Sequence, residues 1–364
     1  METMKKMMGS EKYSSFAVPV DDLAEIRDAT YFLREDGTFA FSEGYCHEPN
    51  RPPDERRLLS HIVFVPNRGN APDYAYKNIF GADYENVTKP IMATQPLRLF
   101  YPLQLREYLK VDPSLDVPKP FYARYKVLVP VNTFVSHFPP RHSLRAIIER
   151  ADSDPAAMSI AKVTEATAEL LQIEPAQIGV SGSLSLGTYA NPHDVDYVIY
   201  ATVKEIRRIV KFIYKLTEEK EERKVFEFGK FWPLRFWERY GGEKIMVCPF
   251  FSYLDLDAAP LRNFSFEDCG PVVVEGVVCD DTHNCFNPTV LVLESAKING
   301  KSYQGELKLI LYHGGERGDY VEGDHLCANG HFGGVTTYGD GGSEVRERFG
   351  AVMVTNLEDV TKIV

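Results

Sequence analysis

The chain has 364 residues, which is longer than the chain that usually forms a single hydrophobic core. Because 44% of the residues are hydrophobic and 26% charged, it is not disordered throughout. Its 41 basic and 52 acidic residues leave a formal net charge of -11. This charge argues against a protein that holds long nucleic acid by bulk electrostatics, because neutralising phosphates needs a basic surface. A local basic groove, or a small anionic substrate carried in with its own metal ion, remains compatible with it.

The sequence also bears on cellular location. Residues 1–8 are followed by polar residues and not by the apolar core of a secretory signal. No stretch approaches the roughly 20 apolar residues that a membrane span needs. The six cysteines are sparse and never form Cys-x-x-Cys, which fits reduced thiols better than a disulfide framework. We therefore expect a cytoplasmic protein with no membrane partner.

The first region, 1–135, has the texture of a small α+β module. Its connections are rich in Pro and Asn, which is typical of surface loops. Its β-type runs are 38–41, 61–65 and 124–132, and the segment 97–109 fits a short helix. We expect this region to form an N-terminal domain.

The second region, 136–261, alternates predicted helices and strands. Asp154 and Pro155 supply an N-cap and a first-turn proline for one of the helices. The predicted helices are 143–151, 154–171 and 204–224, and the predicted strands are 178–180, 195–201 and 245–251. The pattern predicts an α+β domain with a short mixed sheet.

The third region, 262–364, is rich in Gly, Val and turn residues. Its apolar runs are 271–278, 288–293, 307–312 and 350–355. Closely spaced strands separated by Gly and Asp turns indicate a small β-barrel or a sandwich.

Two aspartates, Asp194 and Asp196, stand at the head of the predicted strand 195–201. Residues i and i+2 of a strand point to the same face, so the two carboxylates should project together while Val195 packs inward. Adjacent carboxylates repel each other unless a cation or a proton neutralises them. Hard divalent ions suit this oxygen donor set, and the pair therefore predicts a site for Mg2+ or Mn2+.

A turn rich in Gly and Ser precedes the acid pair. Gly182 and Gly187 flank Ser183 and Ser185, directly after the predicted strand 178–180. Glycine lets the backbone approach a ligand closely, and consecutive N–H groups in such a turn bind anions. A phosphate cradle close to metal-binding carboxylates describes a site for a metal-bound nucleoside triphosphate, where metal ions stabilise the oxygens of an in-line displacement.

Gly182-Ser183, Gly187 and Asp194-x-Asp196, preceded by a helix and followed by a strand and a long helix, resemble the DNA polymerase β-like nucleotidyltransferase superfamily. The resemblance covers most of the second region. It implies that the Gly-Ser turn holds the β- and γ-phosphates, that the two aspartates bind the metal ions, and that a third carboxylate on a later strand completes the site. The turn differs from Walker and Rossmann loops, because no Lys-Ser/Thr closes it.

The sequence departs from the superfamily pattern in two places. Many members have Ser before the first aspartate, where this chain has Pro192-His193. The predicted strand 245–251 contains no acid, so the nearest candidates for the third carboxylate are Asp255 and Asp257 just beyond it. We favour Asp255. If neither residue reaches the metal ions, nucleotide binding survives while transfer is slow or absent.

The whole chain also resembles a group of prokaryotic predicted nucleotidyltransferases. Residues 43–51 are similar to a module that precedes the transferase domain in that group. Residues 286–288 and 323–330 are similar to parts of an OB-type barrel, which would imply oligonucleotide contact. The negative charge and the lack of an evident basic-aromatic stripe argue against such contact, and this resemblance implies no known substrate.

Other residues could in principle bind a metal ion or a ligand, but they also have structural explanations. The cysteine and histidine cluster at 279–285 has a spacing that fits no standard zinc site. His47 and the arginines after it could bind an anionic substrate, although solvated charge is the default in a Pro-rich loop. We interpret Trp232 and Trp237 as packing residues in preference to a base-stacking platform.

We therefore expect an α+β protein with a polymerase β-like nucleotidyltransferase core, an N-terminal α+β module and a C-terminal OB-like barrel. Its expected activity moves a nucleoside monophosphate from an NTP to an acceptor hydroxyl of RNA, protein or a small molecule, and releases pyrophosphate. The alternative is a degenerate transferase domain that binds nucleotide or RNA without chemistry. A third carboxylate near the acid pair favours the enzyme, and an apolar wall on the strand 245–251 favours the binding protein.

Overall fold

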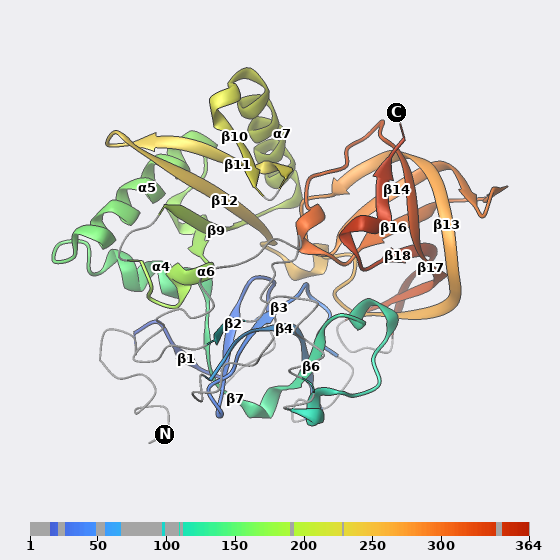
Figure 1. The fold of residues 1–364 in the computed structure, drawn as a ribbon, viewed down its shortest axis with the longest axis horizontal. Coiled ribbons are helices and arrows are strands. Elements are labelled where there is room, and N and C mark those ends of the chain that lie inside the picture. Colours follow the sequence, from blue (N-terminus) through green and yellow to red (C-terminus); the bar gives the residue numbers. More distant parts are fainter. Residues whose placement is uncertain are drawn as a thin grey trace.

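The computed structural model describes residues 15–20, 26–48, 55–66, 97–98, 109, 112–189, 193–227, 229–339 and 344–363. These residues form three successive sheets, and the long helices belong to the middle one (Figure 1). Strands outweigh helices, which is compatible with the predicted α+β class. No helix in the described part of the chain is long and apolar enough to span a membrane.

The N-terminal sheet has the strand order β1-β7-β2-β3-β4-β5, and β6 also pairs with β4. Its strands are β1 (Val18–Pro19), β2 (Tyr31–Arg34), β3 (Phe39–Ser42), β4 (Arg57–Val65), β5 (Leu97–Arg98), β6 (Val127–Pro130) and β7 (Phe134–Phe138). The β-type runs of the sequence coincide with β3, β4 and β6. Of the helix predicted at 97–109, the first two residues form β5 instead, Leu109 is helical, and the rest lies outside the described residues.

The middle domain is a five-stranded sheet with the order β10-β11-β12-β9-β8, in which only β9 and β12 are parallel. The strands are β8 (Ile178–Val180), β9 (Asp194–Ala201), β10 (Lys224–Glu227), β11 (Lys230–Tyr240) and β12 (Glu243–Tyr253). The helices are α4 (Pro140–Ile148), α5 (Pro155–Leu171), α6 (Gly182–Ser185) and α7 (Val203–Glu219).

The ends of two helices follow from local chemistry. The Asp154 carboxylate accepts the N–H groups of Ala156 and Ala157 and caps α5, as its position before Pro155 predicts. Helix α7 ends at Glu219, five residues before the predicted end, because the residues from Lys224 onward pair with β11. The apolar periodicity and the high charge of this segment could not reveal that pairing, since it depends on a strand later in the chain.

The two faces of the middle sheet differ. On β9, Val195, Tyr197 and Ile199 are buried and belong to the hydrophobic core that includes α5 and α7. The Tyr197 hydroxyl, for example, lies 2.9 Å from the hydroxyl of Thr164 on α5. The alternate residues of β9, beginning with Asp194, therefore point to the opposite face, away from the helices.

The C-terminal sheet closes into a barrel. Its strands are β13 (Phe264–His283), β14 (Thr289–Ile298), β15 (Lys301–Ser302), β16 (Leu307–Leu311), β17 (His325–Tyr338), β18 (Val345–Val354) and β19 (Val360–Lys362). The order is β13-β14-β16-β18-β17, and β13 also pairs with β17, which closes the circle. Three consecutive strands with a fourth beside the first make a Greek key. Of the two architectures predicted here, the barrel is the one observed.

The three parts share buried contacts. The N-terminal sheet lies below the middle domain and the barrel in the view of Figure 1. Tyr45 of the N-terminal part contacts Tyr253 of β12 edge to face, with ring centroids 5.1 Å apart, and Tyr253 stacks at 3.8 Å on Phe286 of the barrel. A three-way aromatic contact of this kind disfavours independent movement of the parts, because separation would expose all three rings.

Asn287, in the loop before β14, joins the barrel to the N-terminal part. Its side-chain Nδ2 donates to Asp28 Oδ1 at 3.3 Å and to Glu43 Oε2 at 2.8 Å. We expect Asn287→Ala to lower the free energy of unfolding by about 1–3 kcal/mol, because it leaves two buried acceptors short of a donor. Urea denaturation measures this loss. Asn356→Ala, which removes only the bond to Asp359 in a surface loop, serves as the control and should cost less; equal losses would contradict the assignment.

Candidate functional site

The Gly-Ser turn and the acid pair meet in the middle domain. The turn begins where β8 ends, and the Ser181 N–H donates to the Asp196 carbonyl oxygen at 2.7 Å. Gly182 follows with a φ of 57°, a left-handed conformation that favours glycine. A Cβ atom at position 182 would overlap the Asp196 carboxylate oxygen Oδ2. The backbone of the turn therefore lies directly against one of the two acids.

The acid pair has the geometry predicted from strand alternation. Asp194 is exposed, Asp196 is half-buried, and Val195 between them is 1% exposed. Both carboxylates therefore belong to the sheet face that points away from the helices. His193, which precedes them, is exposed, and its carbonyl oxygen accepts the Met246 N–H at 3.1 Å.

The two serines of the turn differ in their surroundings. Ser185 is buried, and its hydroxyl donates to the Gly182 carbonyl oxygen at 2.9 Å. It therefore closes the turn from inside, and the prediction that it contacts nucleotide does not fit this geometry. Ser183 is half-buried in the first turn of α6, where N–H groups lack partners within the helix. Gly187 ends the turn with a φ of 72°.

The strand next to the acid pair presents an apolar wall. In the parallel register of β9 and β12, Asp194 lies beside Met246 and Asp196 beside Cys248. Met246 is 7% exposed and Cys248 is 2% exposed. Burial raises the pKa of the Cys248 thiol well above its usual range, and the neighbouring Asp196 adds to the rise against the opposing effect of Arg235. A neutral buried thiol is not a ligand for Mg2+, which prefers oxygen.

Asp255 does not complete the site. The register ends with Tyr253 beside Ala201, so Asp255 lies beyond the carboxyl end of β12, while Asp194 begins β9. At about 3.3 Å per residue, the five residues from Cys248 to Tyr253 span about 16 Å, and Asp255 lies beyond the end of the strand. The Asp255 side chain instead accepts the Asp257 N–H at 2.9 Å and caps a turn. This correction could not come from the sequence, which does not reveal the direction of β12 relative to β9.

Asp257 is also occupied elsewhere. Its carboxylate pairs with Arg262 at 2.7 Å and lies 3.7 Å from Arg346 of β18. Among the residues that the structure describes, no group of three His, Cys, Asp or Glu side chains could hold a metal ion. Asp194 and Asp196 are thus the two carboxylates that the described part of the chain brings together at the turn.

A basic and aromatic group continues the same side of the sheet. Arg235 of β11 pairs with Glu227 of β10 at 2.5 Å, and its guanidinium lies 3.9 Å from the ring centroid of Trp232. Both Arg235 and Glu227 act electrostatically on Cys248. This ion pair therefore lies close to the apolar residues of β12 that stand beside the acid pair. Sequence reasoning missed these residues. The only signal was the alternation of charged and aromatic residues between 230 and 240.

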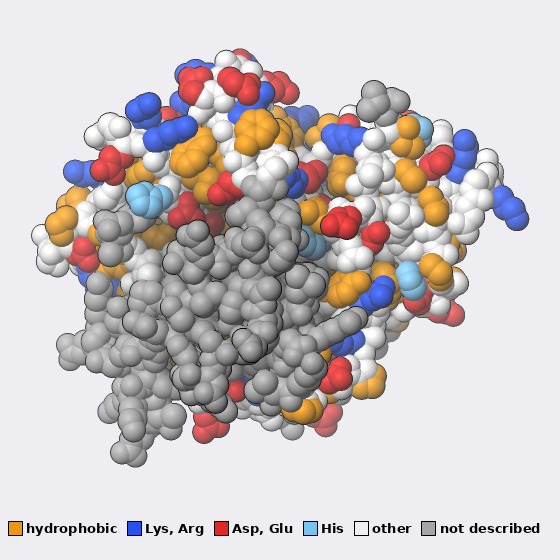
Figure 2. Space-filling model, in the orientation of Figure 1, with side chains coloured by type: hydrophobic (Ala, Val, Ile, Leu, Met, Phe, Trp, Pro, Cys, Tyr) orange, Lys and Arg blue, Asp and Glu red, His pale blue; other side chains and the backbone are white. Residues whose placement is uncertain are grey.

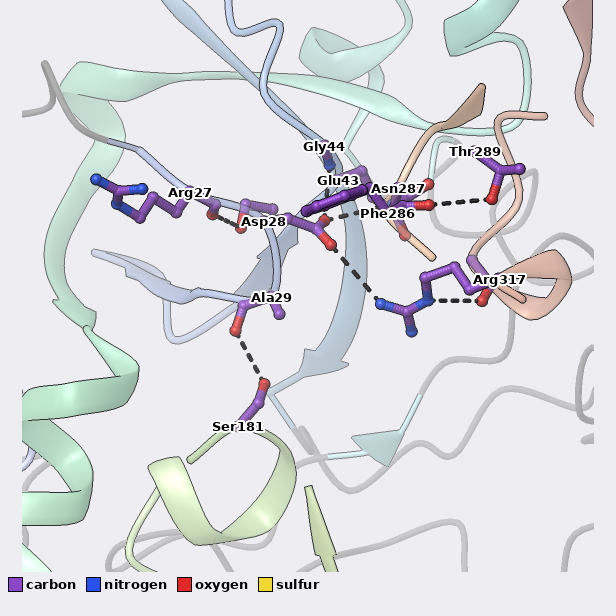
Figure 3. A network of polar contacts seen from close by, with 12 residues as sticks. Arg27, Asp28, Ala29, Glu43, Gly44, Ser181, Phe286, Asn287, Thr289 and Arg317 are labelled. Atoms are coloured by element: carbon purple, nitrogen blue, oxygen red, sulfur yellow. Dashed lines mark hydrogen bonds and ion pairs between the residues drawn. The ribbon is translucent and has the colours of Figure 1, made fainter. Parts of the chain in front are cut away.

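Buried contacts connect the turn to the other two parts of the protein (Figure 3). The Ser181 hydroxyl donates to the Ala29 carbonyl oxygen at 2.9 Å. The adjacent Asp28 is 3% exposed; it accepts the Gly44 N–H at 2.7 Å and lies 3.8 Å from Arg317 of the barrel. The backbone before Gly182 is therefore held by a network that all three parts build, which favours one fixed conformation of the turn.

Asp28 predicts a pH dependence of stability. Burial raises its pKa from an ordinary value of 3.8 to about 6, against the opposing charge of Arg317. Between these values the folded protein holds a proton that the unfolded chain has lost, so this group makes stability fall as pH rises from about 4 to 6. The difference corresponds to on the order of 3 kcal/mol. Urea denaturation between pH 4 and 7 should show this fall for the wild type relative to Asp28→Asn; parallel curves would refute the assignment.

Two other sequence candidates have structural roles. His47 is buried, its pKa is lowered to about 4 by burial, and its Nδ1 accepts the Leu59 N–H at 3.2 Å. In the cluster at 279–285, Cys285 is 1% exposed, and the His283 ring lies 2.8 Å from the Tyr253 hydroxyl. These residues stabilise the junction between the parts of the protein.

Comparisons of this chain with known protein families, with curated proteins and with solved structures gave no match.

Proposed function

We propose that the protein is a metal-dependent nucleotidyltransferase that moves a nucleoside monophosphate from an NTP to an acceptor hydroxyl and releases pyrophosphate. One observation carries the proposal: the left-handed Gly182 packs its backbone against the Asp196 carboxylate, on the face that also holds Asp194. Backbone N–H groups that bind phosphate and carboxylates that bind a cation are thus within reach of one ligand.

The donor set fits Mg2+ or Mn2+. Asp194 and Asp196 would hold the ion, and its remaining positions suit phosphate oxygens and water, because Mg2+ is usually bound by one or two carboxylates together with substrate phosphates. A bound ion would supply charge neutralisation of the phosphates. In this proposal the backbone of the turn orients the triphosphate. The close contact with Gly182 keeps the Asp196 carboxylate in place.

The barrel bears on the acceptor. The five strands of its closed circle and their Greek-key order agree with an OB fold, which in other proteins contacts oligonucleotides. We therefore propose RNA as the first acceptor to test, ahead of a protein side chain or a small molecule. The net charge of -11 limits such an RNA to short, local contact, since extended phosphate binding needs a basic surface.

A second candidate function rests on the apolar wall. Met246 and Cys248 stand beside the acids on β12, and the described residues contain no group of three His, Cys, Asp or Glu side chains that could hold a metal ion. The protein would then bind a metal-bound nucleotide without transferring it.

Label transfer separates the two functions. Purified protein is incubated with NTPs labelled at the α-phosphate, with Mg2+ or Mn2+, and with total RNA or cell extract. An Asp194→Ala/Asp196→Ala double variant is the control. We expect label to move to the acceptor with the wild type alone, and removal of that label by nuclease or protease identifies the acceptor class. Nucleotide binding without transfer, under either metal, would replace the transferase with the binding protein.

A further inference from the structure

One row of side chains crosses three strands on the face of the middle sheet that points away from α5 and α7. Asp194 of β9 lies beside Met246 of β12, and Met246 lies opposite Trp237 of β11. Neighbouring strands are about 4.8 Å apart, so the backbones at Asp194 and Trp237 are roughly 10 Å apart. A charged, an apolar and an aromatic side chain thus follow one another across the sheet.

Trp237 is only half-buried at the end of this row. It packs against the cluster of Met246 and Cys248, and the Lys244 ammonium lies 4.5 Å from its ring centroid. Lys244 and Arg239, opposite each other on the two strands, are both exposed. Figure 2 shows hydrophobic side chains beside Lys and Arg side chains over this part of the middle domain. Trp237 is therefore partly exposed and has positive charge beside its ring.

The other tryptophan is placed differently. Trp232 is 8% exposed, its Nε1 donates to the Glu227 carbonyl oxygen at 3.4 Å, and the Arg235 guanidinium covers its ring at 3.9 Å. Its ring and its polar atom are both engaged by the protein itself. Trp232 thus has the packing role that we expected of both tryptophans, whereas Trp237 keeps part of its surface exposed beside Lys244.

We propose that Trp237 is the stacking platform for the base of the nucleotide whose phosphates are held at Asp194 and Asp196. The inference rests on the proposed function. The row has the spacing of a nucleotide: the acids suit the metal-bound phosphates, the ring suits the base, and the buried Met246 separates the two. Stacking on an aromatic ring tolerates any base, because every base has a π-face. The site therefore selects nucleotides as a class over inorganic polyphosphate.

Fluorescence tests this platform directly, because the chain contains two tryptophans. In the Trp232→Phe variant, Trp237 is the sole tryptophan, and in Trp237→Phe, Trp232 is. Each variant is titrated with Mg2+ and ATP, with Mg2+ and inorganic triphosphate, and with adenosine alone. We expect ATP to quench emission in Trp232→Phe and to leave Trp237→Phe unchanged. Inorganic triphosphate should compete with ATP without quenching.

Affinity provides the second readout. Trp237→Leu keeps the apolar contact but removes the π-face, and calorimetry should show ATP binding weakened about 5- to 150-fold, the range measured for loss of a stacked base. Binding of inorganic triphosphate should not change, which also shows that the variant is folded. Unchanged ATP affinity in Trp237→Leu, or quenching that persists in Trp237→Phe, would overturn the proposal.

The outcomes also distinguish this proposal from the proposed function. If acid-pair variants weaken triphosphate binding while Trp237→Leu binds ATP normally, the platform is wrong and the phosphate site stands. If adenosine quenches Trp237 while acid-pair variants leave triphosphate binding unchanged, the platform stands and the metal-dependent function is wrong.

Discussion

The Asp196→Asn variant should lose at least about 100-fold of its affinity for a metal-bound NTP, because changes even to residues outside the metal's direct ligands reduce metal affinity 10- to 100-fold. Asp196 is half-buried against Gly182, while Asp194 is exposed. We therefore expect Asp194→Asn to have the smaller effect. Asn has the shape of Asp but not its charge, so neither change creates a cavity or removes a large side chain.

The thermal midpoint, measured with and without Mg2+ and NTP, distinguishes loss of binding from loss of folding. Two like charges on one strand face repel each other, so Asp196→Asn should leave the thermal midpoint of the metal-free protein unchanged or slightly higher. The rise in midpoint on adding Mg2+ and NTP, which reflects binding to the folded state, should disappear. Asp255→Asn is the matched control and should keep the full rise. Loss of the rise in Asp255→Asn would contradict the strand register that separates this residue from the acids.

Gly182→Ala should reduce nucleotide affinity about 10- to 100-fold, on the scale known for residues that position metal ligands. Two causes act together. The φ of 57° costs a residue with a side chain about 1–3 kcal/mol. The added Cβ would also overlap the Asp196 carboxylate, so the acid must turn away from the place where we propose that it meets the phosphates.

Gly241→Ala isolates the second cause. Gly241 has a φ of 58°, and a Cβ there meets nothing within 4 Å. Gly182→Ala should therefore lose at least as much stability as Gly241→Ala in urea denaturation, while only Gly182→Ala loses affinity for the metal-bound nucleotide. Equal affinity of the two variants would mean that the contact between Gly182 and Asp196 has no part in binding.

Local features of the fold could be predicted from the sequence. The cap of α5 follows from Asp154 and Pro155, because an N-cap depends on residues a few positions apart. The pairing of Asp194 and Asp196 on one face follows from the two-residue period of a strand. The Gly182 turn was also predictable, since the left-handed backbone there needs glycine.

The sequence by itself therefore determined the acid pair, the glycine turn and their order along the chain. Only the tertiary structure decided what stands beside them: the buried Cys248 next to Asp196, and Trp237 at the end of the row. The physical reason is strand register. The residues that β9 meets on β12 are about fifty positions away in sequence, and a shift of one position turns every side chain to the opposite face. No local pattern specifies that alignment; the packing of the whole sheet does.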